Sequence, residues 1–83
     1  MRVTVKLYAT LGDYLPPGSK HNRVELAAAD HATVSEVLAP FALPPRLTHL
    51  VLVNGVFIPP EERAACRLND GDVLAVWPPI AGG

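Results

Sequence analysis

The chain of 83 residues is long enough for one domain with a single core, and 49% of its residues are hydrophobic while 18% are charged. This composition excludes an intrinsically disordered chain. Seven Lys and Arg against eight Asp and Glu give a formal net charge of −1, so the chain lacks the basic field that would hold a nucleic acid or an anionic membrane surface.

The sequence favours a soluble cytoplasmic protein. Its one cysteine cannot form an internal disulfide, and its first residues alternate apolar with polar side chains instead of forming the apolar run of a signal peptide. No stretch approaches the roughly 20 apolar residues of a spanning helix. We therefore expect a single domain over residues 1–83 that binds neither membranes nor nucleic acids.

The N-terminal third predicts a β-hairpin. Apolar and polar residues alternate over positions 3–8, as in a strand with one buried face, and Tyr8 falls on the outward face. A helical turn is expected over residues 11–15, and the Pro-Pro-Gly sequence within residues 15–19 predicts a loop. The strand predicted at residues 23–27 follows so closely that it is most simply the antiparallel partner of the first.

A short helix is predicted to begin after Thr33. Thr33 and Glu36 have the spacing of a capping box, in which each side chain accepts a hydrogen bond from the other residue's backbone N–H. Pro40 is incompatible with a continuing helix, so the helix should end or kink near Ala39. The residues with the spacing of one apolar helix face are Val34, Val37, Leu38 and Phe41.

The next segments predict a turn and a second hairpin. Residues 44–47 contain two prolines and favour a helical turn. Residues 50–53 are apolar on both faces and are expected to form the core strand of the sheet. The dipeptide Asn54-Gly55 is a strong hairpin signal, leading to a short strand over residues 56–58.

The C-terminal part predicts a last strand over residues 73–77. A helical turn at 61–65 and a tight turn at 69–72, with Gly71 supplying positive φ, precede it. A hairpin, one helix and further strands indicate an α+β domain with the layout of the β-grasp, or ubiquitin-like, fold. First and last strands then lie side by side and parallel, so Tyr8 and Trp77 could share one outward surface.

The orientation of the last strand leaves two alternatives. Strand alternation allows either Leu74 and Val76 or Trp77 to point into the core, but not both sets. We expect Leu74 and Val76 inside. Trp77 would then offer a large, rigid apolar contact area to a partner protein, together with Tyr8.

The last residues, 77–83, are predicted to form a flexible tail that projects from the domain. Pro78 and Pro79 remove two N–H donors and favour an extended backbone, so the chain stops pairing and leaves the sheet. Gly82 and Gly83 have no Cβ, which leaves the terminal carboxylate sterically open. Two interpretations of the terminal glycines are open. They belong either to a frayed chain end, which is commonly rich in glycine, or to a terminus that another protein binds and modifies.

The block from Leu68 through the Asp70-Gly71-Asp72 turn to the Pro-Pro and Gly-Gly of the tail resembles the sulfur-carrier family of small β-grasp proteins. That family includes the small subunit of molybdopterin synthase and the carrier that supplies sulfur for the thiamine thiazole ring. An aromatic residue before Pro78-Pro79 is similar to the molybdopterin branch. The ending from Ile80 to Gly83 and the stretch over residues 53–63 resemble the thiamine carrier.

The resemblance implies that a ubiquitin-activating-like adenylyltransferase uses ATP to adenylate the Gly83 carboxylate. A sulfur donor then displaces AMP and leaves a thiocarboxylate on Gly83, the covalent carrier. Gly82 gives clearance in the partner's channel, while Pro78, Pro79, Ile80 and Ala81 form the arm. The catalytic groups lie on partners, including a larger synthase subunit, and no cofactor is bound by the chain itself.

We expect sulfur donation for molybdopterin. Three alternatives remain: thiamine or another sulfur pathway, a ubiquitin-like modifier joined to lysines, and a β-grasp binding module whose Gly-Gly is incidental. Cys66 has no second cysteine and no cationic neighbour except Arg67, which favours an inert thiol. No metal site is expected, because the three histidines, His21, His31 and His49, are far apart in sequence and have no ligand spacing.

Overall fold

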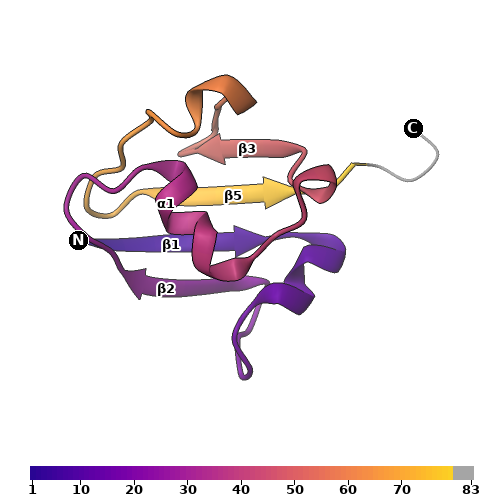
Figure 1. The fold of residues 1–83 in the computed structure, drawn as a ribbon. Helices are drawn as coiled ribbons and strands as arrows, with labels where there is room; N and C mark the ends of the chain where they lie inside the picture. The colour runs from indigo at the N-terminus through magenta and orange to yellow at the C-terminus, as the bar shows by residue number, and fades with distance from the viewer. Residues whose placement is uncertain (80–83) are drawn as a thin grey trace.

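The computed structural model describes residues 1–79 and contains a five-stranded mixed sheet with one α-helix (Figure 1). Its order is β2-β1-β5-β3-β4, with β1 and β5 parallel and the other neighbours antiparallel. The strands are β1 (Arg2–Leu7), β2 (Arg23–Ala27), β3 (Leu50–Val53), β4 (Val56–Phe57) and β5 (Val73–Trp77). This is the predicted α+β arrangement, with the first and last strands adjacent.

The N-terminal hairpin forms as its alternation predicts. Val3, Val5 and Leu7 are buried, and β1 pairs with β2 in a register that places Val5 opposite Val24. A 3-10 helix over Ala9–Tyr14 joins the two strands and buries Leu11 in the core. Tyr8 lies just beyond β1, so it takes the outward position that follows Leu7.

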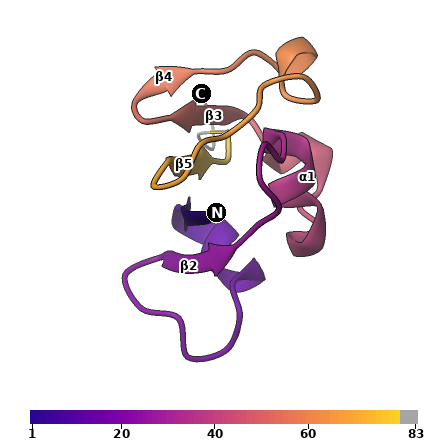
Figure 2. The same ribbon diagram turned by 90° about the vertical axis from the view of Figure 1, so that its left-hand side faces the viewer.

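Helix α1 (Val34–Leu38) covers one face of the sheet (Figure 2). It begins with the predicted capping box. The Glu36 N–H donates to the Thr33 hydroxyl over 3.1 Å, and the Thr33 N–H donates to the Glu36 carboxylate over 2.9 Å. The latter bond holds the pKa of Glu36 below its ordinary value. The α-helix ends at Leu38, and the chain continues as a 3-10 helix over Ala39–Phe41, which accommodates Pro40 as expected.

Removing the capping hydroxyl should weaken the domain measurably. Thr33→Ala is expected to lower the free energy of unfolding by about 1 kcal/mol, because the Glu36 N–H loses its acceptor at the helix start. Urea unfolding monitored by circular dichroism measures this change. Ser35→Ala, an exposed substitution in the same helical turn, is the matched control and should leave the midpoint nearly unchanged. Equal losses for the two variants would contradict the capping assignment.

The core strand is β5, and the expectation that residues 50–53 would fill this role is wrong. Strand β5 lies in the middle of the sheet, and its Leu74 and Val76 are fully buried. In β3 only Val51 is fully buried, because Leu50 and Leu52 lie on the side of the sheet opposite α1 and the outer neighbour of β3 is the two-residue strand β4. Strand β4 also ends at Phe57, one residue before the predicted Ile58.

The turns follow their local chemistry. Asn54 and Gly55 have φ of 49° and 84°, the left-handed values of a type I′ hairpin turn. The Asn54 side chain also accepts from the Val73 N–H and donates to the Asp72 carboxylate, each over 2.9 Å, which ties the hairpin to the start of β5. The other two predicted helical turns appear as 3-10 segments, Pro45–Leu47 and Pro60–Glu62.

Within residues 1–79, no helix has the length and hydropathy needed to cross a membrane. The core lies between α1 and the sheet. Its fully buried side chains are Val3, Val5, Leu7, Leu11, Val34, Val51, Leu68, Leu74 and Val76.

Candidate functional site

The C-terminal arm leaves the sheet from the end of its central strand. The Val76 carbonyl accepts from the Tyr8 N–H over 3.0 Å, and the Trp77 carbonyl accepts from the His49 N–H over 3.2 Å. Pro78 and Pro79 have no N–H to continue this pairing, and exposure increases from the half-buried Pro78 to the exposed Pro79. Four predicted tail residues, Ile80, Ala81, Gly82 and Gly83, lie outside the described residues.

A stacked aromatic pair lies where the arm begins. The rings of Tyr8 and Trp77 have centroids 4.1 Å apart and an interplanar angle of 1°. The parallel register of Leu7 with Val76 brings the next residues of the two strands together. Leu74 and Val76 point into the core, so both predictions for this region are confirmed: the inward pair, and an outward surface shared by Tyr8 and Trp77. Their role in binding a partner stays a prediction.

The aromatic pair belongs to a larger apolar area on the side of the sheet opposite α1. Leu50 pairs with Trp77, and Leu52 pairs with Ala75 on one side and with Phe57 on the other. Phe57 is 49% exposed. We call this area, formed by Tyr8, Leu50, Leu52, Phe57 and Trp77, the sheet face. A partner that covers it would also meet the start of the arm, because Trp77 belongs to both.

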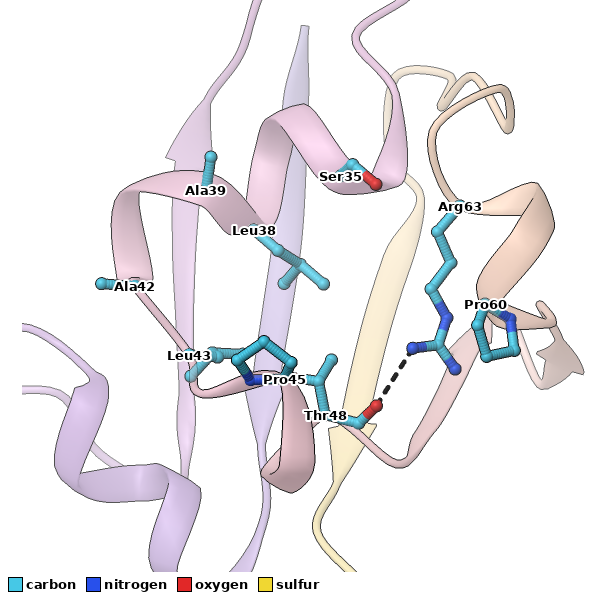
Figure 3. A pocket seen from close by; sticks show the side chains of 9 residues that line it. All are labelled: Ser35, Leu38, Ala39, Ala42, Leu43, Pro45, Thr48, Pro60 and Arg63. Carbon is cyan, nitrogen blue, oxygen red and sulfur yellow. Dashed lines mark hydrogen bonds between the residues drawn. The ribbon is translucent and has the colours of Figure 1, made fainter.

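A pocket of about 420 Å³ lies on the helix side of the molecule (Figure 3). Arg63, a residue that the sequence did not single out, forms one wall and is only 9% exposed. Its guanidinium donates to the backbone carbonyls of Ile58, Thr48 and His49 over 3.0, 3.0 and 3.1 Å. Burial lowers the pKa of Arg63 below its ordinary value, while Glu61 acts in the opposite direction.

Arg63 ends the stretch of residues 53–63 that resembles the thiamine carrier, but nothing in the sequence predicts its hydrogen bonds. It lies in the predicted helical turn over residues 61–65. Its acceptors are the Ile58 carbonyl, five residues away, and the Thr48 and His49 carbonyls, 15 and 14 residues away. Only the fold brings these carbonyls around one guanidinium.

The remaining candidate side chains do not converge in the described part of the chain. Residues 1–79 contain no group of three or more His, Cys, Asp or Glu side chains that could hold a metal ion. Cys66 is a half-buried free thiol, and the Arg67 guanidinium donates instead to the His31 carbonyl. These residues therefore add no nucleophile or metal ligand to the start of the arm.

A mixed five-stranded sheet, one helix across one face and a C-terminal strand in the centre define the class of ubiquitin-like β-grasp proteins. The chain belongs to the ThiS family, whose sequence profile matches residues 5–83. Among curated proteins no sequence matches it. This membership confirms the fold and the family that the resemblance implied.

Solved structures agree with this assignment over the whole chain. SAMP1 from Haloferax volcanii is 26% identical with a TM-score of 0.70, and each chain is covered in full. The molybdopterin-converting factor from Helicobacter pylori, a complex of subunits 1 and 2, contains a chain with 20% identity and a TM-score of 0.63, again with full coverage of both. The thiamine biosynthesis protein ThiS from Geobacter metallireducens has 20% identity and a TM-score of 0.66, with both chains covered completely.

The family and the folds together define the class to which the chain belongs. It has the fold of the ThiS-like sulfur carriers and the small ubiquitin-like modifiers. At 20% identity the molybdopterin and thiamine neighbours show the fold alone, so they do not separate the two sulfur pathways.

Proposed function

We propose that this protein is a sulfur carrier, that Gly83 is the terminal residue of its working form, and that it donates sulfur in molybdopterin biosynthesis. The observation that carries the proposal is the family match, which includes the whole tail to residue 83. The arm continues directly from the central strand of the sheet, past two prolines that end its pairing. An arm attached in this way presents its end to a partner while the folded domain stays outside the partner's active site.

The chemistry follows from the poor reactivity of a carboxylate. A carboxylate oxygen of Gly83 attacks the α-phosphorus of ATP on an adenylyltransferase, and the bond to pyrophosphate breaks. A donor with sulfur at the oxidation level of sulfide then attacks the acyl carbon, and the bond to AMP breaks. Adenylation supplies the leaving group that the carboxylate lacks, and all catalytic groups come from the partner.

Docking is proposed to use the sheet face. It combines the stacked Tyr8 and Trp77 rings with Leu50 and Leu52 next to the arm, so one contact can position the domain and guide the tail. The Helicobacter pylori neighbour is a complex of subunit 1 with subunit 2 of the molybdopterin-converting factor. By analogy we propose a larger synthase subunit as the partner that receives the sulfur.

The molybdopterin branch is favoured by the aromatic Trp77 before Pro78-Pro79, the feature by which the chain resembles the small synthase subunit. Sulfur delivery for the thiamine thiazole ring is the alternative within the family.

A ubiquitin-like modifier is the second candidate function. SAMP1, a small archaeal modifier protein, matches the full chain with 26% identity. A modifier would use the same adenylated Gly83 but transfer it to lysines of target proteins. Conjugates that migrate above the free protein in cell extract, and that disappear when Gly83 is deleted, would support this function over sulfur transfer.

Intact mass spectrometry of the protein from its native host tests the sulfur-carrier proposal. Without reducing or alkaline treatment, a fraction of molecules should be heavier by the difference between one sulfur and one oxygen atom, with the change located at Gly83. The same species should form when an activating enzyme, ATP and sulfide are supplied to the purified protein. A carboxylate that stays unmodified under both conditions would contradict the proposal. The large subunit or synthase that co-purifies then identifies the pathway.

A further inference from the structure

The helix-side pocket combines an apolar wall with one buried cation (Figure 3). Thr48, Ser35 and the guanidinium of Arg63 supply its polar groups. The apolar part comes from the end of α1, the 3-10 segments and the loops between them: Leu38, Ala39, Ala42, Leu43, Pro45 and Pro60. Because α1 covers the side of the sheet opposite the sheet face, a ligand in this pocket would leave Tyr8 and Trp77 free.

Among residues 1–79 no carboxylate lies within ion-pair distance of Arg63, and Glu61 acts on its charge only from farther away. The one ion pair in this part of the chain joins the N-terminal ammonium of Met1 to Asp30. A guanidinium has five N–H donors, and the carbonyls of Ile58, Thr48 and His49 use three. One N–H on each terminal nitrogen remains. Buried charges are normally paired because desolvation is costly, so an anion at this position would be bound favourably.

Arg63 is also preorganised to receive an anion. Three carbonyls fix its guanidinium, so binding costs little further side-chain entropy. The hydroxyl of Thr48 already donates to the Pro44 carbonyl over 3.0 Å, which leaves Arg63 as the main polar anchor of the pocket. An occupant must therefore pair a negative group for Arg63 with an aliphatic group for Leu38, Leu43 and the prolines.

We propose that this pocket binds an acidic side chain of a partner protein, a glutamate or aspartate flanked by an aliphatic residue. A free organic acid fits less well, because Ala39, Ala42, Pro45 and Pro60 are exposed and the pocket is open to solvent along them. A small ligand there would stay largely hydrated, whereas ligand sites usually bury most of the ligand surface. A side chain that projects from a protein gains further contact around the rim of the pocket.

This inference is independent of the chemistry at Gly83, and isolated protein is sufficient to test it. The probes are acetyl-Leu-Glu-Leu-amide, its neutral match acetyl-Leu-Gln-Leu-amide, and 4-methylpentanoate as a free acid, each titrated into ¹⁵N-labelled protein and followed by NMR. The glutamate peptide is expected to bind with a millimolar dissociation constant and to shift the amides of Ser35, Leu43 and Thr48. The glutamine peptide should bind at least about tenfold more weakly, because its neutral amide cannot form an ion pair with the guanidinium.

Arg63→Met removes the cation together with three hydrogen bonds, so this variant does not separate lost binding from lost local structure. Ser35→Asp is the better variant. Ser35 is exposed and lines the pocket, so a carboxylate placed there repels the carboxylate of the ligand. It should weaken glutamate-peptide binding at least about tenfold. Thr10→Asp adds the same charge at an exposed position outside the pocket and should bind the peptide like the unmodified protein.

Three results would overturn the proposal. One is equal affinity for the glutamate and glutamine peptides, and another is equal peptide binding by the two aspartate variants. The third is binding of 4-methylpentanoate as tight as that of the glutamate peptide, which would assign the pocket to a free organic acid. None of these results affects the thiocarboxylate measurement, so failure here leaves the sulfur-carrier proposal unchanged.

Discussion

Deletion of Gly83 should slow thiocarboxylate formation at least about 100-fold, because it shortens the arm by one residue, roughly 3.3–3.6 Å when extended. The new terminal carboxylate then stops short of the α-phosphorus of ATP, and a misplacement of about 1 Å can cost about 100-fold in rate. Single-turnover reactions with activating enzyme, ATP and sulfide, analysed by intact mass, measure the loss.

Gly83→Ala is the matched control for this deletion. It keeps the carboxylate at the same distance along the arm and adds one methyl group. It therefore separates the effect of arm length from the effect of side-chain size at the terminal residue. The alanine variant should react more slowly than the unmodified chain but faster than the deletion variant. Both should unfold at the same urea concentration as the unmodified protein, because the buried core spans residues 3–76. A deletion variant that acquires sulfur at the normal rate would contradict the role of Gly83.

Features set by neighbouring residues could be predicted from the sequence. The capping box of Thr33 and Glu36, the helix end before Pro40 and the Asn54-Gly55 turn each depend on a few consecutive residues, and each is present. The burial ranking of the strands depends instead on which strands flank each one. Residues 50–53 and residues 73–77 are both wholly apolar, so composition does not rank them. Strand β5 is more buried because the long strand β1 and strand β3 flank it, whereas β3 has the two-residue strand β4 on its outer side.

The candidate site divides in the same way. The shared surface of Tyr8 and Trp77 could be predicted because strand alternation and a parallel first and last strand are enough to place two side chains together. The environment of Arg63 could not be predicted, because it consists of backbone carbonyls from remote segments. Every residue has a backbone carbonyl, so the sequence does not show which of them the fold brings together. The tail is predicted from the backbone chemistry of its two prolines and two glycines and from the resemblance of the block that begins at Leu68, and its four last residues lie beyond the described ones.

Trp77→Ala should weaken docking to the activating enzyme or the larger synthase subunit by about 30-fold, which corresponds to about 2 kcal/mol. The indole is half-buried, stacks on Tyr8 and lies next to Leu50 at the start of the arm. Its removal takes away the largest rigid apolar group of the sheet face. Calorimetric titration of the purified partner measures the dissociation constant, after circular dichroism has shown that the variant is folded.

Tyr8→Ala and the double variant complete a cycle that tests the stack itself. If Tyr8 acts mainly by holding the Trp77 ring flat, its substitution should cost less affinity once Trp77 is absent, with a coupling of about 0.5–1.5 kcal/mol. Val56→Ala is the control, because Val56 is 63% exposed and lies outside the sheet face, so its loss should leave the affinity unchanged. If Trp77→Ala, Val56→Ala and the unmodified protein bind the partner with equal affinity, the partner recognises the tail without the sheet face. The stacked pair would then stabilise the junction of β1 and β5 without taking part in docking.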